Sequence, residues 1–255
     1  MGKPFILISN DDGVYAKGLA VLIKIARRFG DVMVVASERG ESGMSHAITI
    51  KHPIRITKVK EEEGLQIFSI NGTPTDSIKV ALNQLVDRKP DIVLSGINHG
   101  SNASISVIYS GTLGAAREGC LNQIPSLGFS LLNHDKDADF STVAHYLPQI
   151  IEQALEKRIA DQTFLNINFP DIAIDKVKGF KICRQTKGVW KEEYESRTDP
   201  HGGTYYWLTG AFKNFEPDAE DTDEWALAHD YIAIVPTKID ATSYTELDNI
   251  KTWKL

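Results

Sequence analysis

The chain has 255 residues, of which 42% are apolar and 24% charged, and these are the proportions of an ordinary soluble globular protein. Its formal net charge of −6 argues against a broad surface for a nucleic-acid duplex or an anionic membrane. No apolar run approaches the roughly 18 residues needed to cross a bilayer, and we expect no signal peptide. Cys120 and Cys183 have no metal-like spacing, so we expect two free thiols and a cytoplasmic protein.

The first predicted strand is the apolar run 5–8, and it runs directly into Ser-Asn-Asp-Asp-Gly at 9–13. Ligands of an open α/β sheet bind outside the carboxyl ends of its strands, so paired acids at this point are well placed for chemistry. The same residues can instead form an Asx turn, in which Asn and Asp bond only their own backbone. Both Asp11 and Asp12 can reach one ion only if the chain has already turned there, and Gly13 favours such a turn.

Strands and helices alternate along the first 170 residues, which predicts an α/β fold with a doubly wound, mostly parallel sheet. Apolar residues at helical spacing predict helices over about 19–29, 78–86 and 143–155. Pro148 predicts a kink in the last of these helices or a start at that residue. Residues 55–59 and 65–70 predict a hairpin inserted in the sheet. The strands of the sheet, the first one included, are predicted at about 4–8, 32–36, 92–95, 126–132 and 163–168.

Beyond Pro170 the pattern changes to polar loops and short β-like runs, at 179–184, 204–208 and 231–235. We therefore treat 1–255 as one domain with a core at 1–170 and a β-rich C-terminal extension at 171–255 that serves as an oligomerisation arm. Three tryptophans of the extension either cover the protein's own core or mark an interface with another subunit. They are Trp190, Trp207 and Trp225.

Two further polar loops follow predicted strands, at 37–46 and 96–102, and they add oxygen-bearing side chains to the same edge of the sheet. The candidate ligands from the three loops are Asp11, Asp12, Ser42 and Asn98. Hard oxygen ligands of this kind suit Mg²⁺ or Mn²⁺ rather than zinc, and Ca²⁺ is equally compatible with them.

A phosphate-binding helix start is the second candidate feature. Ser110 or Thr112 can cap a helix whose free N–H groups face an anion, although an ordinary cap without a ligand has the same sequence. The segment 72–76 (Gly-Thr-Pro-Thr-Asp) allows the same two interpretations.

Several motifs in this order resemble the signature set of the SurE 5′-nucleotidases, the survival-protein phosphatases. The resemblance covers roughly the first 170 residues, and the extension fits less closely, at 222–223 and 231–240. The matching segments are Ser9-Asn10-Asp11-Asp12-Gly13, Ser42-Gly43-Met44-Ser45, Gly72-Thr73-Pro74-Thr75-Asp76, Ser95-Gly96-Ile97-Asn98 with Gly100 and Asn102, Tyr109-Ser110-Gly111-Thr112, and Asn166-Ile167-Asn168-Phe169-Pro170.

The resemblance implies a divalent-metal-dependent phosphatase with a Rossmann-like core, acting on nucleoside 5′-monophosphates and other small phosphomonoesters. It implies one divalent cation per subunit and an extension exchanged within a homodimer or homotetramer. The implied metal ligands are Asp11, Asp12, Ser42 and Asn98. The implied catalytic residues are Asn10, Asp11, Ser110, Gly111 and Thr112, and the implied substrate-binding residues are Gly43, Ser45 and Asn102. His99 lies where the family tolerates variety, and we interpret it as a loop residue rather than a general acid.

Two mechanisms fit these residues. In the favoured one, a metal-activated water attacks phosphorus in line. In the other, Asp11 is a nucleophile that forms an aspartyl phosphate, a scheme that adjacent acids fit poorly. A nucleotide- or metal-binding sensor without turnover is the alternative function. A dinucleotide-binding oxidoreductase is disfavoured because no Gly-x-Gly-x-x-Gly follows the first strand.

Overall fold

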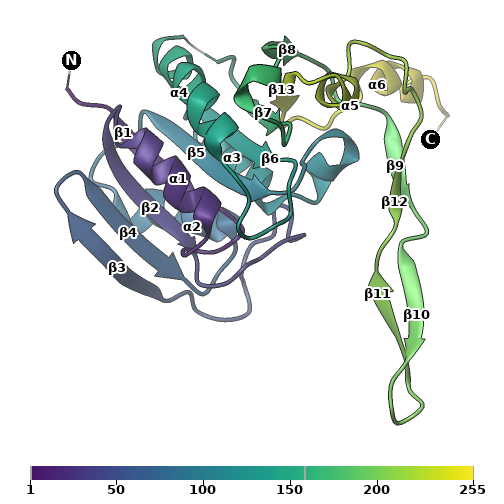
Figure 1. Cartoon of the computed structure of the whole chain (residues 1–255), viewed down its shortest axis with the longest axis horizontal. Coiled ribbons are helices and arrows are strands. Elements are labelled where there is room, and N and C mark those ends of the chain that lie inside the picture. Colours follow the sequence, from purple (N-terminus) through teal and green to yellow (C-terminus); the bar gives the residue numbers. More distant parts are fainter. Residues whose placement is uncertain (1, 158, 255) are drawn as a thin grey trace.

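The computed structural model describes residues 2–157 and 159–254. Within these residues nine strands form one sheet in the order β3-β4-β2-β1-β5-β6-β7-β13-β8 (Figure 1). The strands from β4 to β7 in this order are mutually parallel, whereas β3 and β13 are antiparallel to their neighbours β4 and β7. The strands are β1 (Phe5–Ser9), β2 (Asp31–Ser37), β3 (Ile56–Glu62), β4 (Leu65–Ile70), β5 (Ile92–His99), β6 (Ser126–Leu131), β7 (Thr163–Phe169), β8 (Phe180–Ile182) and β13 (Ile232–Lys238). The predicted parallel sheet and its inserted hairpin are confirmed.

Helices cover both faces of the sheet, because successive residues of the buried strands point to opposite sides. On one side Ile6 and Ile8 of β1 join the apolar cluster that includes α1 (Lys17–Ala26) and α4 (Ser141–Glu156). On the other side Leu7 packs in a cluster with residues of α2 (Pro74–Val80) and α3 (Gly111–Leu121). The sheet is therefore doubly wound, as the alternating pattern predicts.

The helix ends agree in part with the predicted signals. The side chains of Thr73 and Ser110 cap α2 and α3, and a π-helical turn (Ala81–Leu85) continues α2. Helix α1 ends four residues before Gly30, and α4 neither starts nor stops at Pro148, which lies inside it. None of the helices among the described residues is long and apolar enough to cross a membrane.

The strand order reverses direction around β1. From β1 the chain moves to β2 on one side, and β5 later pairs with the other side, with Ser9 opposite Ser95 at the carboxyl ends. Such a switch point leaves a crevice between the loops that follow the two strands. The segments 10–13 and 98–102, which both carry predicted site residues, meet at this crevice.

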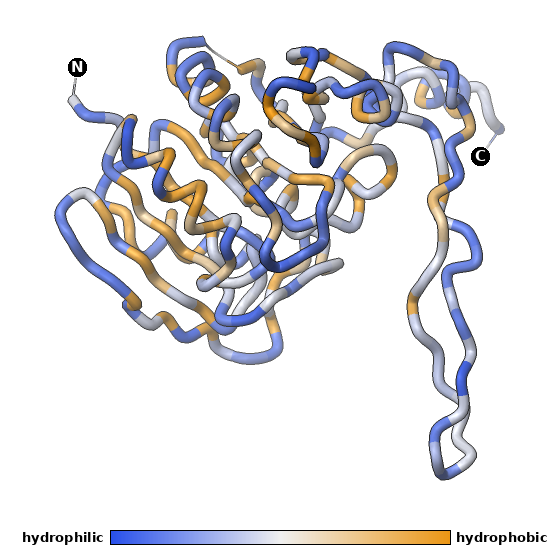
Figure 2. The backbone as a smooth tube through the Cα atoms, in the orientation of Figure 1, coloured by the Kyte–Doolittle hydropathy of each residue, from blue (hydrophilic) through white to orange (hydrophobic). Residues whose placement is uncertain are grey.

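The sheet continues past residue 170, since β13 pairs with β7 and β8 pairs with β13. The segment that leaves the body is shorter than the predicted extension. It is an antiparallel ribbon, which we call the arm, formed by β9 (Gly188–Lys191), β10 (Tyr194–Thr198), β11 (Thr204–Leu208) and β12 (Ala211–Asn214). Figure 1 shows the arm running away from the body, and in Figure 2 it is mostly blue and white, whereas orange segments concentrate in the body.

The arm is anchored by the buried carboxylate of Asp223, the first residue of α5 (Asp223–Ala228). Asp223 accepts hydrogen bonds from the backbone and hydroxyl of Thr186 at 2.9 and 2.6 Å, and from the N–H of Ser104 at 2.8 Å. The Ser104 hydroxyl donates in turn to the Thr186 carbonyl. Each bond to a charged group contributes about 1.5–3 kcal/mol, so this network fixes the arm to the turn at Ser104.

The three tryptophans of the extension differ in burial. Trp225 covers the protein's own body, where its ring stacks on His229 with centroids 3.9 Å apart. Trp207, on the arm, is 58% exposed, and the nearby Tyr194 and Tyr206 are exposed to a similar extent. Trp190 is half-buried and packs edge-to-face on Phe212 across the arm. The C-terminal helix α6 (Tyr244–Ile250) has no buried residue and was not predicted.

The acid beside the anchor makes stability depend on pH. Burial and the Asp223 carboxylate raise the pKa of Glu224 from 4.5 to about 7. Between these values the folded chain holds a proton that the unfolded chain has lost, so stability falls as pH rises through this window. Glu224→Gln removes the ionisation and, after allowance for partial exposure, should raise the melting temperature at pH 8 by about 2–4 °C.

The gain of Glu224→Gln should disappear near pH 4.5, where the native carboxyl is also neutral. The exposed Glu220 provides the matched control, and Glu220→Gln should change the melting temperature equally little at both pH values. A gain for Glu224→Gln that is the same at pH 4.5 and pH 8 would contradict this account.

Candidate active site

A cavity of about 450 Å³ opens at the carboxyl end of the sheet, over the crevice beside β1 and β5. Its lining comes from six separate segments, which include the loop after β1, the loop after β2, the end of β5 and the arm. The lining residues are Asp11, Ser42, Gly43, Asn98, His99, Gly100, Ser101, Asn102, Ser106, Tyr109, Ser110, His134, Trp190, Glu193, Leu208 and Thr209. The three predicted polar loops therefore meet at one place.

Asp11 is only 3% exposed, and its carboxylate lies against the start of α3. The Thr112 hydroxyl donates to Asp11 Oδ1. A Cβ added to Gly111 would lie 2.9 Å from Asp11 Cβ, so only glycine leaves room for this carboxylate. Burial and the Asp12 charge raise the pKa of Asp11 to about 6, although the Thr112 hydroxyl and backbone lower it. The anion that α3 faces is thus the Asp11 carboxylate.

Asp12 is held by the end of β5. The N–H of His99 donates to Asp12 Oδ2 at 3.2 Å. Burial raises the pKa of Asp12, and the His99 N–H opposes that rise. Two adjacent carboxylates therefore sit in desolvated surroundings, where both lose hydration energy and repel each other.

A hard divalent cation fits this donor set. It would neutralise the two carboxylates, and the buried Asn10 Oδ1 has no hydrogen-bond partner among the described residues while its Nδ2 donates to Gly13. Asn98 Nδ2 donates to the Gly100 carbonyl at 2.8 Å, which leaves the amide oxygen of Asn98 available as a ligand. No group of three or more His, Cys, Asp or Glu side chains with metal-ligand geometry exists in residues 2–157 and 159–254. The predicted ligand set contains only two side chains of these four types, the Asp11 and Asp12 carboxylates, and its other two ligands are a hydroxyl and an amide.

The loop after β2 carries the predicted residues Ser42, Gly43 and Ser45. Ser42 and Gly43 line the cavity, and both are exposed. Ser45 does not line it, because its hydroxyl donates to the Ile108 carbonyl at 2.6 Å and its N–H to that of Tyr109. Ser45 therefore joins this loop to the segment before α3.

The segment 72–76 holds the same loop from the other side. The Thr73 hydroxyl donates to the Ala47 carbonyl at 2.7 Å, and Asp76 accepts from the Thr49 N–H and from the Thr73 N–H. These side chains bind the protein's own backbone, and none of them lines the cavity.

Ser110 and Asn102 line the cavity while also making bonds inside the fold. Ser110 Oγ accepts from the Leu113 N–H, so the Ser110 hydroxyl proton is free for another acceptor. Asn102 Nδ2 donates to Ser130, and its backbone bonds to the side chains of Asn168 and Asn166, each at 2.8 Å. Asn102 is thus part of a buried amide network.

His99 lies in the cavity wall, at the end of β5. Its Nδ1 is 2.8 Å from the Asp135 carbonyl oxygen, which can only accept, so Nδ1 carries a proton. Its ring packs edge-to-face on Phe140 with centroids 5.1 Å apart. The remaining nitrogen, Nε2, is the atom that could act on a ligand.

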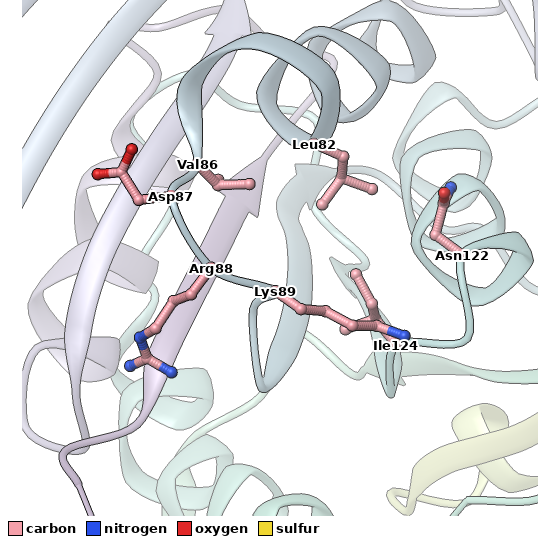
Figure 3. Close-up of a pocket in the computed structure, with 7 residues that line it drawn as sticks. All are labelled: Leu82, Val86, Asp87, Arg88, Lys89, Asn122 and Ile124. Carbon is pink, nitrogen blue, oxygen red and sulfur yellow. The ribbon is translucent and has the colours of Figure 1, made fainter.

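A second hollow, of about 330 Å³, lies at the amino end of the strands, beside the segments that lead into β5 and β6 (Figure 3). Its guanidinium group, from Arg88, already donates to the Lys3 carbonyl and the Asp91 carboxylate. None of the predicted site residues lines it. The candidate site is therefore the cavity at the carboxyl end.

Sequence reasoning missed the part of the cavity wall that comes from the arm. Trp190, Glu193, Leu208 and Thr209 line the cavity together with Asp11, which lies 179 to 198 residues earlier in the chain. The clustering of tryptophans in the extension was the available signal, but it does not indicate which part of the body they meet.

The model of the family "Survival protein SurE" matches residues 6–192, which is most of the chain. The chain belongs to the SurE family. The "5′-nucleotidase SurE" of Phocaeicola vulgatus is 51% identical over 99% of this chain and 98% of its own length. The relative with the same name from Chlorobaculum tepidum is 38% identical over 99% of this chain and 95% of its own.

A solved structure of a SurE family member agrees with the fold. The crystal structure of the SurE protein from Aquifex aeolicus superposes with a TM-score of 0.84 at 33% identity, covering 97% of this chain and 98% of that one. The predicted family resemblance and fold class are confirmed.

The hydrogen bond from Thr112 to Asp11 can be tested by stability alone. Thr112→Val keeps the side-chain volume but removes the donor, so it should lower the free energy of unfolding at pH 8 by about 1.5–3 kcal/mol. Thr112→Ser keeps the hydroxyl and should cost less, although it loses a buried methyl group. Urea denaturation measures both variants. A loss of less than about 0.5 kcal/mol for Thr112→Val would show that the hydroxyl contributes nothing.

Proposed function

We propose that the chain is a divalent-metal-dependent phosphomonoesterase that hydrolyses nucleoside 5′-monophosphates. The observation that carries the proposal is the pair of desolvated carboxylates, Asp11 and Asp12, held between the start of α3 and the end of β5. Family membership supports it, because curated relatives across nearly the full length are named 5′-nucleotidases. The proposed site residues are those named from the resemblance, with Ser45 acting through the loop it holds.

Asp11, Asp12, Ser42 and Asn98 would hold the cation. When bound, such an ion supplies positive charge to a phosphoryl group and lowers the pKa of water. A phosphate oxygen would find donors in the Ser110 hydroxyl, whose proton is free, and in the exposed Ser42 and Gly43 of the loop after β2. Thr112 holds Asp11 in place, and Gly111 gives Asp11 its room.

We propose water, rather than Asp11, as the nucleophile. Asp11 is almost fully buried, and its Oδ1 already accepts the Thr112 hydroxyl. Attack by this oxygen would require that bond to break. Water reaching the open cavity needs no such rearrangement.

We also propose that the protein is a homodimer or homotetramer in the cytoplasm, joined through the arm. The outer arm carries exposed aromatic side chains on both of its faces, Tyr194 and Tyr206 on one and Trp207 on the other, and aromatic side chains are enriched at interfaces. Cys120 and Cys183 are both free and buried, in keeping with a reducing compartment.

The cation site predicts a dependence on both metal and Asp12. Activity on adenosine monophosphate should vanish after chelation and return with Mg²⁺ or Mn²⁺. Asp12→Asn should abolish turnover and reduce the rise in melting temperature that Mn²⁺ causes, because one carboxylate cannot neutralise the ion. The remote, exposed Asp175 gives the control Asp175→Asn, which should behave as the native chain does. Full turnover of the native chain after exhaustive metal removal would refute metal dependence, and binding without any turnover would indicate a sensor.

The role of the arm in assembly can be tested without disturbing the sheet. Tyr194 and Leu208 are paired across the ribbon, so residues 195–207 can be replaced by Asn-Gly, a two-residue hairpin turn. The shortened chain should form particles with fewer subunits, measured as the particle mass from light scattering divided by the mass of one chain. Its body should melt within a few degrees of the native protein, since β13 and β8 are retained. An unchanged number of subunits would contradict assembly through the outer arm.

A further inference from the structure

The arm contributes the apolar part of the cavity wall. Three large apolar side chains are among the lining residues, and two of them, Trp190 and Leu208, come from the arm. The third, Tyr109, precedes the cap of α3 and is half exposed. The metal-ligand candidates and Ser110 come from the body instead, so the cavity combines a polar region with an aromatic one.

The position of Trp190 is fixed from several directions. Trp190 is paired with Phe212 on β12, and their rings meet edge-to-face with centroids 6.0 Å apart. Strand β9, which carries Trp190, lies against the short helical turn Ser104–Ile108. That turn is joined to the start of the arm by the Asp223 network. A ring held in this way binds a flat ligand with little further loss of conformational freedom.

We infer that Trp190, with Leu208, binds the nucleoside part of the substrate and thereby gives the enzyme its preference for nucleoside monophosphates over phosphomonoesters of small aliphatic alcohols. The inference rests on the proposed phosphatase function for its catalytic consequence. A cavity of about 450 Å³ has the size of a small-molecule site, with room for a nucleoside beside the phosphate.

The chemistry of the wall selects for a planar group. Base–aromatic stacking is tolerant of base identity, because every base presents a π-face, and it changes affinity by about 5- to 150-fold per base. A small aliphatic alcohol offers no such face. Binding energy from this remote part of the substrate can be used at the reacting phosphate, so its loss lowers kcat/KM rather than affinity alone.

Adenosine is the direct probe, because it has the nucleoside and lacks the phosphate. Its binding can be measured by calorimetry with a chelator present, so the result depends on neither metal nor turnover. Trp190→Leu should weaken adenosine binding about tenfold, and Trp190→Phe, which keeps an aromatic ring, should restore most of it. Trp207 is on the same arm but outside the cavity, and Trp207→Leu should bind adenosine as the native chain does.

Kinetic measurements separate this inference from the proposed function. Trp190→Leu should lower kcat/KM for adenosine monophosphate about tenfold and leave that for glycerol phosphate within about twofold. Equal losses on both substrates, or no adenosine binding to the native chain, would overturn the inference and leave the phosphatase proposal standing. Adenosine binding that depends on Trp190, without hydrolysis of either ester, would support the nucleoside site and refute the phosphatase.

Melting temperatures distinguish a loss of adenosine binding from a loss of folding. Trp190 also packs on Phe212, and Trp190→Leu removes this ring contact at the base of the arm. Trp190→Phe keeps the ring pair and serves as the folded reference. If Trp190→Phe melts with the native protein yet loses adenosine binding as fully as Trp190→Leu, an aromatic ring is insufficient and stacking is not the basis of the contact.

Discussion

The burial of two adjacent carboxylates at the end of β1 is the constraint on which the rest of the site depends. Like charges in desolvated surroundings are costly, and the neighbouring segments are arranged to limit that cost. The start of α3 supplies the Thr112 hydroxyl to Asp11, and the end of β5 supplies the His99 N–H to Asp12. The Asp11 carbonyl also accepts the Glu41 N–H at 2.7 Å, which draws in the loop after β2. One pair of acids thus determines where three other segments lie.

Behind this pair, a chain of buried amides holds the loop that follows β5. Asn166 and Asn168 lie on β7, where Asn166 donates to the Asn102 carbonyl and Asn168 donates to Asn166. Asn102 donates in turn to Ser130 on β6, the strand between β5 and β7. Buried polar groups are stable only when their hydrogen bonds are made, so these residues specify a single arrangement of the loop. The motif at the end of the core therefore serves the site without lining it.

The sequence predicted those features whose cause is local. Strand ends, the Thr73 and Ser110 caps and the glycine turn at 13 follow from neighbouring residues, and the structure contains them. The bonds of Ser45 could not be predicted from its motif: its hydroxyl and N–H join its loop to the segment before α3, and its predicted role in substrate binding stays a prediction. The paired strands of the arm were mostly missed, because their exposed positions carry no clear alternation between apolar and polar residues.

The contact between the arm and the cavity is the feature furthest from any local signal. It depends on a network in which Asp223 joins Thr186, at the start of the arm, to Ser104, in the turn that leads to Tyr109 and α3. Arg184 reinforces the same base through Glu216 and Asp221, in the loop that follows β12. The base of the arm, which carries Trp190, is thereby fixed to the turn that leads to the cavity wall. The surface that we assign to assembly and the wall that we assign to the nucleoside are therefore two ends of one ribbon.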